Sequence, residues 1–569
     1  MQIIRMKRPP ALIAVSTLGI IIIAFAVFAN QLGLDHNTRW GAFRTSLLVL
    51  GILALICSAF FFIVASKLKR IFFLTTLIGT FIIAVYVWFV SVGFWTKWPS
   101  TTNYYDMLGT SFRYGQLSLE PRPNSALLDL PNPYDVQARK LRPDAFYIFD
   151  GSLYNGKFYL YWGPAPAVFL AAIKFLIPSE IGDQYIVFAS VLGLFIIQSI
   201  FALKLWGRFF PDLPAWTALL GIFLCGLISP MTWMLNQPEI YEASIASGQF
   251  FLIGGLFFAF IALDNKPLPS LWQLSLAGIL LSLAIASRLT LLLPVLFIAA
   301  MIILWIAQDY FRTRNLANTW KPLVALAIPL IGGAILLGWY NWARFGSVFE
   351  SGLRYQLSGI DYRNHFKDIF SLSYIPANLY NYLLTPFKYI RTFPFLKPYS
   401  GDQSFALFHR VPGFYYSREK ITGLLYTAPF LLFALISVSV TAAKVLEKHP
   451  NDSSGDAIAN QKSLAWISIV LAGVASASFI IIMIYFYATM RFIDDFMPAL
   501  VLFALIGFWQ GYQSLSRWRT IQISYSILAI GLAVATIVIS TVLAISGYKE
   551  RFSELNPTLF HSLVVLFRP

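Results

Sequence analysis

The threading of this chain through a membrane is decided by Tyr161-Trp-Gly-Pro-Ala-Pro-Ala-Val-Phe-Leu-Ala-Ala-Ile-Lys-Phe-Leu-Ile-Pro178. The stretch is apolar, but Pro164 and Pro166 stand at its start and Lys174 near its end. Counting it as a full crossing would put every later basic cluster on the non-cytoplasmic side, whereas Lys and Arg are enriched in cytoplasmic segments. We therefore predict that it forms a helix on the outer membrane surface and does not cross.

Outward from this stretch, apolar runs recur along most of the chain. A spanning helix needs about 20 mostly apolar residues. Runs of that kind lie at about 11–32, 44–66, 71–95, 183–205, 214–235, 243–263, 270–288, 289–308, 322–341, 422–444, 463–487, 495–511 and 521–546. They predict an all-α polytopic membrane protein with about thirteen transmembrane helices and with its termini on opposite sides.

Basic residues give one consistent orientation. Arg5, Lys7 and Arg8 place the N-terminus in the cytoplasm, which puts the C-terminus outside. Under the same alternation these basic residues also fall inside: Lys67, Lys69, Arg70, Lys204, Arg208, Arg312, Arg314, Arg517 and Arg519.

The composition excludes a soluble globule. The 569 residues are 58% hydrophobic, 17% aromatic and only 12% charged, too few polar residues to cover a soluble surface of this size. The net charge of +16 is spread over short segments between helices and does not gather on one face, so it does not indicate nucleic-acid binding. Cys57 and Cys225 lie inside apolar runs, where neither a disulfide nor a cysteine metal site is expected.

Two long segments are predicted outside the membrane, 96–182 and 342–421. Both are rich in Tyr, Phe, Pro and Asn, unlike the aromatic-poor composition of flexible linkers. We expect them to fold against the membrane surface, the first with interfacial helices, as parts of a single membrane domain covering 1–569.

Two carboxylates of the first outer loop are candidates for acid–base chemistry. Asp106 and Asp150 are set among aromatic residues, a setting that raises a carboxyl pKa or holds a base near a bound hydroxyl. Each also has a structural interpretation. Asp150-Gly followed by Asn155-Gly is typical of a turn and hairpin, and Asp106 suits the start of a helix.

Further charged residues fall at helix ends on the same predicted side. Arg suits a phosphate because its planar fork donates two parallel bonds, although each Arg could instead extend to the lipid headgroups. The residues predicted here are Glu239, Glu242, Arg288, Arg344, Arg491, Asp494 and Asp495.

Other kinds of chemistry leave no pattern in the sequence. Most predicted spans have no ionisable residue near the middle, where ion-coupled transporters usually carry one. The five histidines show no metal-ligand spacing, and there is no Walker A loop, dinucleotide fingerprint or nucleophile elbow. The energy for a reaction must arrive in an activated lipid or a gradient.

Several motifs resemble one family. The motifs that show the resemblance are a Tyr-rich loop ending in Gly115-Gln-Leu, Asn132-Pro-Tyr, Asp150-Gly-Ser-Leu-Tyr-Asn-Gly-Lys-Phe-Tyr-Leu-Tyr-Trp-Gly-Pro-Ala-Pro, Tyr340-Asn-Trp-Ala-Arg-Phe-Gly-Ser and Met490-Arg-Phe-Ile-Asp-Asp-Phe-Met-Pro. Together they resemble the bacterial GT-C membrane glycosyltransferases, close to the protein O-mannosyltransferases, the aminoarabinose transferases and the rhizobial lipopolysaccharide sugar transferases.

The resemblance implies transfer of a sugar from a polyprenyl-phosphate donor, with an outer-loop Asp as base and with Arg and Lys residues on the donor phosphate. This chain departs from the better-known branches at two places. Ser100 stands where their Asp-Glu pair begins, and Trp162 and Gly163 replace their Glu-Lys. Asp150 and Asp106 are therefore inferred as substitute bases.

The remaining site assignments rest on the same resemblance. The predicted donor phosphate ligands are Lys157, Arg288 and Arg344, and the predicted substrate-binding residues are Tyr154, Glu239, Glu242, Arg491 and Asp494. A carboxylate-lined site could hold a divalent cation, but no dedicated ligand set is visible.

The sequence thus predicts a polyprenyl-phosphate-dependent glycosyltransferase of the bacterial inner membrane and cell envelope, acting on a lipid, glycan or protein acceptor at the periplasmic face. Two alternatives stay open. One is a lipid or polysaccharide transporter or flippase, which would show pseudo-repeats and midplane charge. The other is a non-catalytic scaffold with a GT-C-like fold.

Overall fold

The protein is built almost entirely from membrane-spanning helices. A computed structural model describes residues 10–29, 44, 47–48, 50–52, 54–55, 67–264, 268–313, 316–400, 413–416, 419–446 and 455–568. Eight helices among these residues are long and apolar enough to cross a membrane, which identifies an integral membrane protein.

Most described residues of the predicted spans are helical. The helices at these positions are α1 (Pro10–Phe28), α3 (Lys67–Val90), α8 (Asp183–Phe209), α9 (Ala215–Leu227), the short α10 (Met231–Asn236), α11 (Ile240–Asp264), α12 (Leu271–Ser287), α13 (Leu292–Thr313), α14 (Leu316–Phe345), α17 (Ala434–Leu446), α18 (Gly455–Met483), α19 (Met497–Ser514) and α20 (Arg519–Ser546). The predicted span at 44–66 lies largely outside the described residues, so the count of thirteen stays a prediction.

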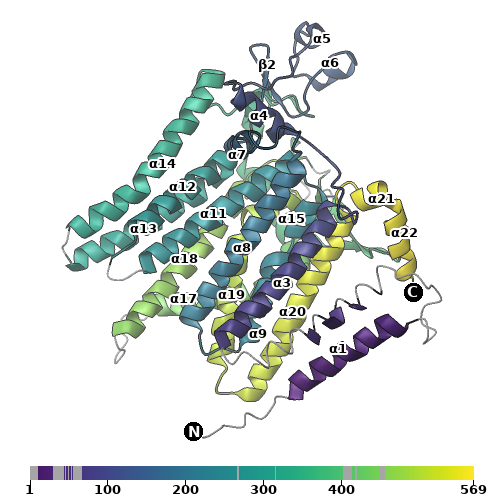
Figure 1. Cartoon of the computed structure of the whole chain (residues 1–569). Coiled ribbons are helices and arrows are strands. Elements are labelled where there is room, and N and C mark those ends of the chain that lie inside the picture. The colour runs from purple at the N-terminus through teal and green to yellow at the C-terminus, as the bar shows by residue number, and fades with distance from the viewer. Residues whose placement is uncertain are drawn as a thin grey trace. The chain divides into compact units, whose positions relative to one another are not determined.

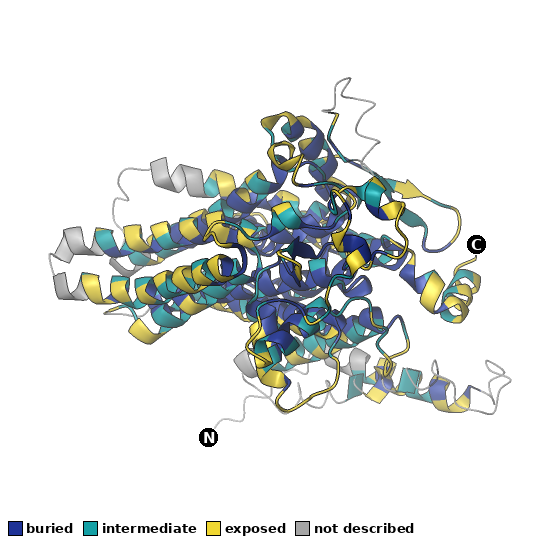
Figure 2. Cartoon of the chain, turned by 90° about the horizontal axis from the view of Figure 1, so that it is seen from above, coloured by how far each residue is buried: buried dark blue, intermediate teal, exposed yellow. Residues whose placement is uncertain are grey.

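Internal contacts separate the chain into two compact units, Met1–Thr80 and Phe81–Pro569. The predicted single domain is not tested by this division. The second unit holds every element from α4 onward, and α11 is buried along most of its length, with α8 and α12 packed against it. Figure 2 shows buried residues gathered toward the middle of the helices, with exposed residues around them. The core of the second unit is therefore formed by helices that are apolar on all sides, as expected where lipid replaces water.

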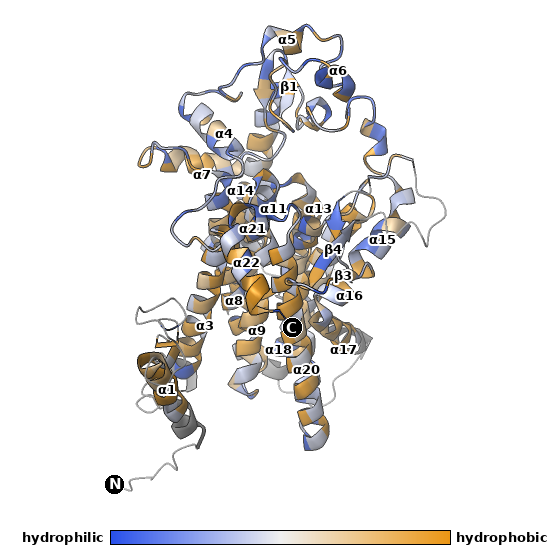
Figure 3. Cartoon of the chain, turned by 90° about the vertical axis from the view of Figure 1, so that its right-hand side faces the viewer, coloured by the Kyte–Doolittle hydropathy of each residue, from blue (hydrophilic) through white to orange (hydrophobic). Residues whose placement is uncertain are grey.

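The two long segments between helices are folded, and they lie at one end of this unit (Figure 1). The first contains α4 (Tyr104–Arg113), α5 (Ser125–Leu128), α6 (Val136–Lys140), β1 (Ser152–Tyr154), β2 (Lys157–Tyr159) and α7 (Ala165–Ile173). The second contains η2 (Leu353–Tyr355), η3 (Phe366–Asp368), η4 (Leu372–Tyr374), α15 (Ile375–Leu383), β3 (Phe387–Tyr389), β4 (Leu396–Ser400) and β5 (Lys420–Ile421). Figure 3 shows them as the hydrophilic end of a mostly hydrophobic bundle.

Shorter elements complete the chain. They are η1 (Leu289–Leu291), α16 (Leu424–Thr427), η6 (Pro429–Phe433), η7 (Met490–Asp495), α21 (Arg551–Leu555) and α22 (Pro557–Leu566). β1 and β2 form an antiparallel hairpin, and β3, β4 and β5 form a small antiparallel sheet in that order.

The stretch 161–178 does not cross the membrane. Its helix α7 has 9 residues and is only about 14 Å long at 1.5 Å per residue, against a hydrocarbon core of about 30 Å. α7 packs on α4, where a Cβ added at Gly109 would lie 3.1 Å from Leu170 Cβ. The stretch thus contains a helix too short to span, and its place on the outer membrane surface stays a prediction.

The two outer segments are joined by hydrogen bonds at one place, which we call the loop junction: residues 150–152 with residues 352–358. Asp150 N donates to Leu357 O (3.0 Å), and Leu357 N donates to Gly151 O (2.8 Å). Ser152 Oγ donates to Gly352 O (2.9 Å), and Ser152 also pairs with Gln356 as an isolated bridge. The junction fixes the backbone of Asp150 against a segment two hundred positions away in the sequence.

Candidate active site

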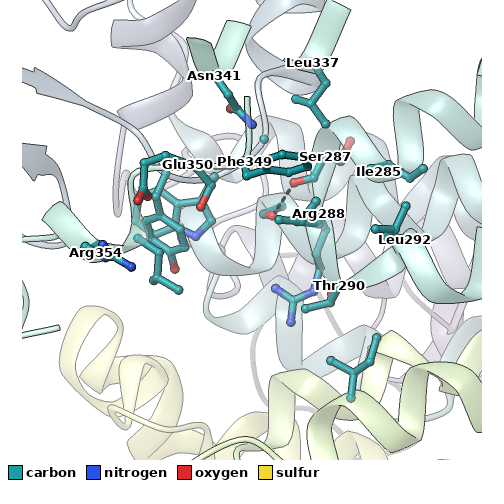
Figure 4. Close-up of a pocket in the computed structure, with 18 of the residues that line it drawn as sticks. Ile285, Ser287, Arg288, Thr290, Leu292, Leu337, Asn341, Phe349, Glu350 and Arg354 are labelled. Carbon is teal, nitrogen blue, oxygen red and sulfur yellow. Dashed lines mark hydrogen bonds between the residues drawn. The ribbon is translucent and has the colours of Figure 1, made fainter. Parts of the chain in front are cut away.

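A cavity of about 890 Å³ opens at the loop-bearing end of the bundle (Figure 4). It lies where α12 turns into α13, beside the C-terminal ends of α14 and α18 and beneath the loop after α14. One wall is apolar and is made by Leu289, Leu292, Leu293, Leu296, Leu337, Ile481 and Ile482. The α13 residues Leu292 and Leu296 are 43% and 55% exposed, so this wall faces the lipid side of the helix bundle.

The opposite wall is aromatic and carries hydroxyl groups. It includes Tyr161, Trp162, Tyr241, Tyr355, Phe366, Phe370, Tyr485, Tyr487 and Phe492. Such rings offer an apolar body with a polar tip, as suits a boundary between lipid and water. The 161–164 backbone lies directly on α12, because a Cβ at Gly163 would fall 2.0 Å from Ala286 O.

Two of the predicted phosphate ligands, Arg288 and Arg344, line the cavity. Arg288 follows α12 and forms a bidentate pair with Asp495, with bonds of 2.7 and 2.6 Å. Arg344, in the last turn of α14, donates to Leu160 O (2.5 Å) and to Asn341 Oδ1 (2.8 Å). Both guanidinium groups are thus held in place by the protein before any ligand arrives.

A third arginine in the cavity wall was not predicted. Arg354 lies in η2, is exposed, and has its guanidinium carbon 4.6 Å from the centroid of the Phe366 ring. Among the described residues no hydrogen bond or ion pair holds its guanidinium group. The cavity therefore contains a cation whose donors are free to meet an anion.

Asp150 lies behind the aromatic wall at the loop junction. Its φ of +59° is in the left-handed region, which is uncommon for a residue other than glycine. Oδ2 accepts a hydrogen bond from the hydroxyl of Tyr241, near the start of α11. Burial raises the pKa of Asp150, and the bond from Tyr241 opposes that rise.

The link through Tyr241 is the route from Asp150 to the cavity. Among the described residues, Tyr241 lines the cavity and Asp150 does not. The edge of Trp162 contacts the Tyr241 ring at a centroid distance of 5.5 Å, and the guanidinium carbon of Arg491 lies 4.8 Å from its centroid. The titratable and charged groups that act on Asp150 are Arg139, Arg491, Tyr104, Tyr161, Tyr241, Tyr362 and Tyr487.

Three of the predicted substrate-binding residues surround this link. Arg491, in η7, lies 3.6 Å from Glu419. Glu242 is buried and accepts a bond from Glu239 N (3.3 Å), while the Glu239 carboxylate pairs with Lys549 (2.6 Å). Of these three residues, Arg491 contacts the Tyr241 ring directly.

Asp106, the other predicted base, is placed elsewhere. It lies in α4, pairs with Lys174 Nζ at 2.8 Å and accepts a bond from Ile181 N (2.9 Å). Among the described residues the cavity wall does not include Asp106. Its observed contacts hold α4 to the end of α7, so the structure shows a binding partner for this carboxylate.

Two predicted site residues of the β1–β2 hairpin, Tyr154 and Lys157, are not part of the cavity wall as described. Tyr154 packs on Tyr355 with ring centroids 4.7 Å apart, so it supports the cavity wall from behind. Lys157 is exposed next to the Asn155–Gly156 turn of the hairpin and does not line the cavity in the part of the chain that is described.

Asp494 is the most enclosed of the predicted site residues, with 0% exposure. Neither carboxylate oxygen has a hydrogen-bond partner among the described residues. Burial, with the neighbouring Asp495 carboxylate, raises the pKa of Asp494 to about 8. Neither Asp494 nor Arg491 lines the cavity as described.

No group of three or more His, Cys, Asp or Glu side chains in the described residues is arranged to hold a metal ion. Sequence reasoning also missed Tyr241, Arg354 and Glu419. Tyr241 stands between the predicted residues Glu239 and Glu242, where only the carboxylates were considered. The free Arg354 gave no signal, because its role depends on which other arginines are already paired.

No family model and no curated protein matches this sequence. Among solved structures, the chain is similar over 84% of its length to the oligosaccharyltransferase AglB of Archaeoglobus fulgidus, with 12% identity and a TM-score of 0.40. It is similar to ArnT of Cupriavidus metallidurans, solved bound to undecaprenyl phosphate, over 84% of its length with 12% identity and a TM-score of 0.37. The match spans 56% of AglB and 76% of ArnT.

The likeness is one of fold. The activity of this chain is inferred from its own residues.

Proposed function

We propose that this protein is a glycosyltransferase that moves a sugar from a polyprenyl-phosphate-linked donor to a hydroxyl of a lipid, glycan or protein acceptor. The observation that supports it is the make-up of one cavity. A lipid-facing leucine wall, three arginines and a tyrosine bonded to a buried carboxylate all meet there. These are the groups that an apolar tail, a phosphate leaving group and an acceptor hydroxyl require.

The apolar wall suits the isoprenoid tail of the donor. Leu292, Leu293 and Leu296 lie on one side of α13, and each is at least 43% exposed. A chain lying along them exchanges lipid contacts for protein contacts at little cost, while the phosphate stays at the polar end of the cavity.

The arginines suit the phosphate. Arg288 and Arg344 are pre-positioned by their protein partners, and Arg354 contributes the free guanidinium group. During transfer the bond from the sugar to the phosphate oxygen breaks, and negative charge grows on that oxygen. Fixed donors around the leaving phosphate then stabilise the transition state more than the ground state.

The orientation comes from the basic residues of the sequence. In this proposal the N-terminus is in the cytoplasm of a bacterial cell, and the cavity and the C-terminus are on the periplasmic face of the inner membrane. The acceptor then reaches the site from the aqueous side, past the outer segments.

Arg354→Gln tests the phosphate assignment. Replacing the free cation should weaken binding of a polyprenyl phosphate about 10–100-fold, because a charge-assisted hydrogen bond is worth roughly 1.5–3 kcal/mol. The measurement is titration of purified protein with undecaprenyl phosphate. It is joined to transfer assays in membranes with radiolabelled polyprenyl-phosphate hexoses, pentoses and hexuronic acids.

Arg363→Gln is the matched control. Arg363 is also an exposed arginine of the second outer segment over an aromatic ring, with its guanidinium carbon 4.8 Å from the Tyr134 centroid, but it is outside the cavity wall as described. Equal losses in both variants would remove Arg354 from the phosphate site. Binding of undecaprenyl phosphate by the unmodified protein without transfer of any sugar would favour a transporter or a scaffold.

A further inference from the structure

The position of Asp150 raises a problem that the proposed function does not solve. A base must come within hydrogen-bond reach of the proton that it removes. Asp150 is 6% exposed and, among the described residues, is not part of the cavity wall. A sugar hydroxyl in the cavity therefore meets another group before it meets this carboxylate.

That group is Tyr241. Its hydroxyl donates to Asp150 Oδ2, and its ring lines the cavity, so one side chain touches both the carboxylate and the cavity. The ring is held edge-on by Trp162. Tyr241 is also the second residue of α11, whose burial leaves the backbone at this point little freedom.

A cation lies over the Tyr241 ring. Arg491 lies 4.8 Å from the ring centroid and is held in place by Glu419 at 3.6 Å. A guanidinium group over an aromatic ring is attracted to its electron density, and more strongly so where water is excluded.

We propose that Tyr241 and Asp150 act as a proton-relay dyad, in which Tyr241 Oη receives the acceptor proton while its own proton passes to Asp150 Oδ2. This deepens the proposed function and rests on it. The acceptor O–H bond breaks, a new bond forms from that oxygen to the sugar, and the sugar–phosphate bond gives its electron pair to the phosphate. Asp150 ends the step protonated, Tyr241 ends it unchanged, and no further reactant is needed.

Tyr241→Phe is the direct test, because it removes only the hydroxyl. The relay predicts that kcat for transfer falls about 10²-fold or more, the usual contribution of a positioned acid–base group. Binding of undecaprenyl phosphate should stay within about twofold, since no phosphate ligand is changed.

Tyr134→Phe is the control for loss of a buried tyrosine bond. Tyr134 is a buried residue of the first outer segment, which also contains Asp150. It donates to Leu153 O at 2.7 Å and has no contact to Asp150. It should keep its kcat. A fall in kcat of the same size in both variants would show that Tyr241 acts through the fold, and would overturn the relay.

The pH profile separates the relay from a passive bond. The Tyr241 hydroxyl stabilises the charged carboxylate and so holds the pKa of Asp150 down. Without it, the acid limb of any remaining activity should move to higher pH, whereas Tyr134→Phe should leave the limb in place. An unmoved limb in Tyr241→Phe would contradict the bond itself.

Failure of the dyad differs from failure of the proposed function. If Asp150→Asn abolishes transfer while Tyr241→Phe keeps more than about a third of the wild-type kcat, Asp150 acts directly and the relay is wrong. If the unmodified protein neither binds undecaprenyl phosphate nor transfers any sugar, the proposed function fails and the relay fails with it.

Discussion

The α4–α7 corner and the loop junction each bury one carboxylate of the first outer segment, and they do so to the same degree. Asp106 and Asp150 are both 6% exposed. At the corner, Lys174 and a backbone amide neutralise Asp106. At the junction, no cation contacts Asp150 within salt-bridge distance in the described residues, and its bond is to a tyrosine that faces a cavity.

Burial alone does not determine whether a carboxylate can take a proton. A carboxylate that is matched by a buried ammonium group is committed to the fold, because opening the pair leaves a charge without a partner. A carboxylate that is satisfied only by a neutral hydroxyl keeps the capacity to take a proton. The partner, and the direction in which the partner faces, separate a structural acid from a catalytic one.

The largest effect expected from this comparison is on catalysis, at the junction. Asp150→Asn keeps the shape of the side chain but cannot accept a proton, so transfer should fall about 10²–10⁴-fold. The measurement is the initial rate of sugar transfer in membranes, normalised to folded protein. Full activity in this variant would remove Asp150 from the mechanism.

The next effect is on stability, at the corner. Asp106→Asn leaves Lys174 buried without its counter-charge and should lower the free energy of unfolding by about 3–5 kcal/mol. Transfer per folded molecule should change little. The measurement is thermal unfolding of the purified protein, with Asp106→Asn/Lys174→Gln expected to recover part of the loss. Unchanged stability with lost transfer would instead make Asp106 the base.

The smallest effect concerns Asp494, a buried carboxylate of a third kind that has neither a cation nor a hydroxyl partner among the described residues. Its pKa rises from 3.8 to about 8 on folding, so the folded protein binds this proton more tightly than the unfolded chain. The contribution of this bound proton to the stability of the folded protein is complete below about pH 4 and is lost as pH rises toward about 8.

Asp494→Asn removes this dependence. At pH 8 the variant should melt at a higher temperature than the wild type, with a free energy of unfolding larger by on the order of 1 kcal/mol. This difference in stability should shrink toward pH 5. Melting curves across that range check the sign. A variant that is less stable at every pH would show that the Asp494 carboxylate has a partner in the folded protein.

Much of the fold could be predicted from local pattern. Apolar runs located most of the helices, and Asn155-Gly156 is the turn of the β1–β2 hairpin. The outer-surface position of 161–178, inferred from the distribution of Lys and Arg, stays a prediction. Arg288 and Arg344 do meet in one cavity, as their shared side of the membrane predicted.

The hydrogen bonds and ion pairs of the site could not be predicted from local sequence pattern. The Tyr241–Asp150 bond joins residues 91 positions apart, and no spacing rule connects a helix start to a loop at that distance. The freedom of Arg354 is a property of the whole arrangement, since it depends on Asp495 and Asn341 having bound the other two arginines. For the same reason the sequence could not rank Asp150 above Asp106.

The loop junction also has a consequence for biosynthesis. Ser152 and Gly352 are 200 positions apart, an interval that takes a ribosome roughly 10–40 s at 5–20 residues per second. During that time Asp150 has been made but its partner strand has not. If the proposed function holds, transfer from a lipid-linked donor therefore begins only after the second outer segment has folded onto the first and fixed Asp150.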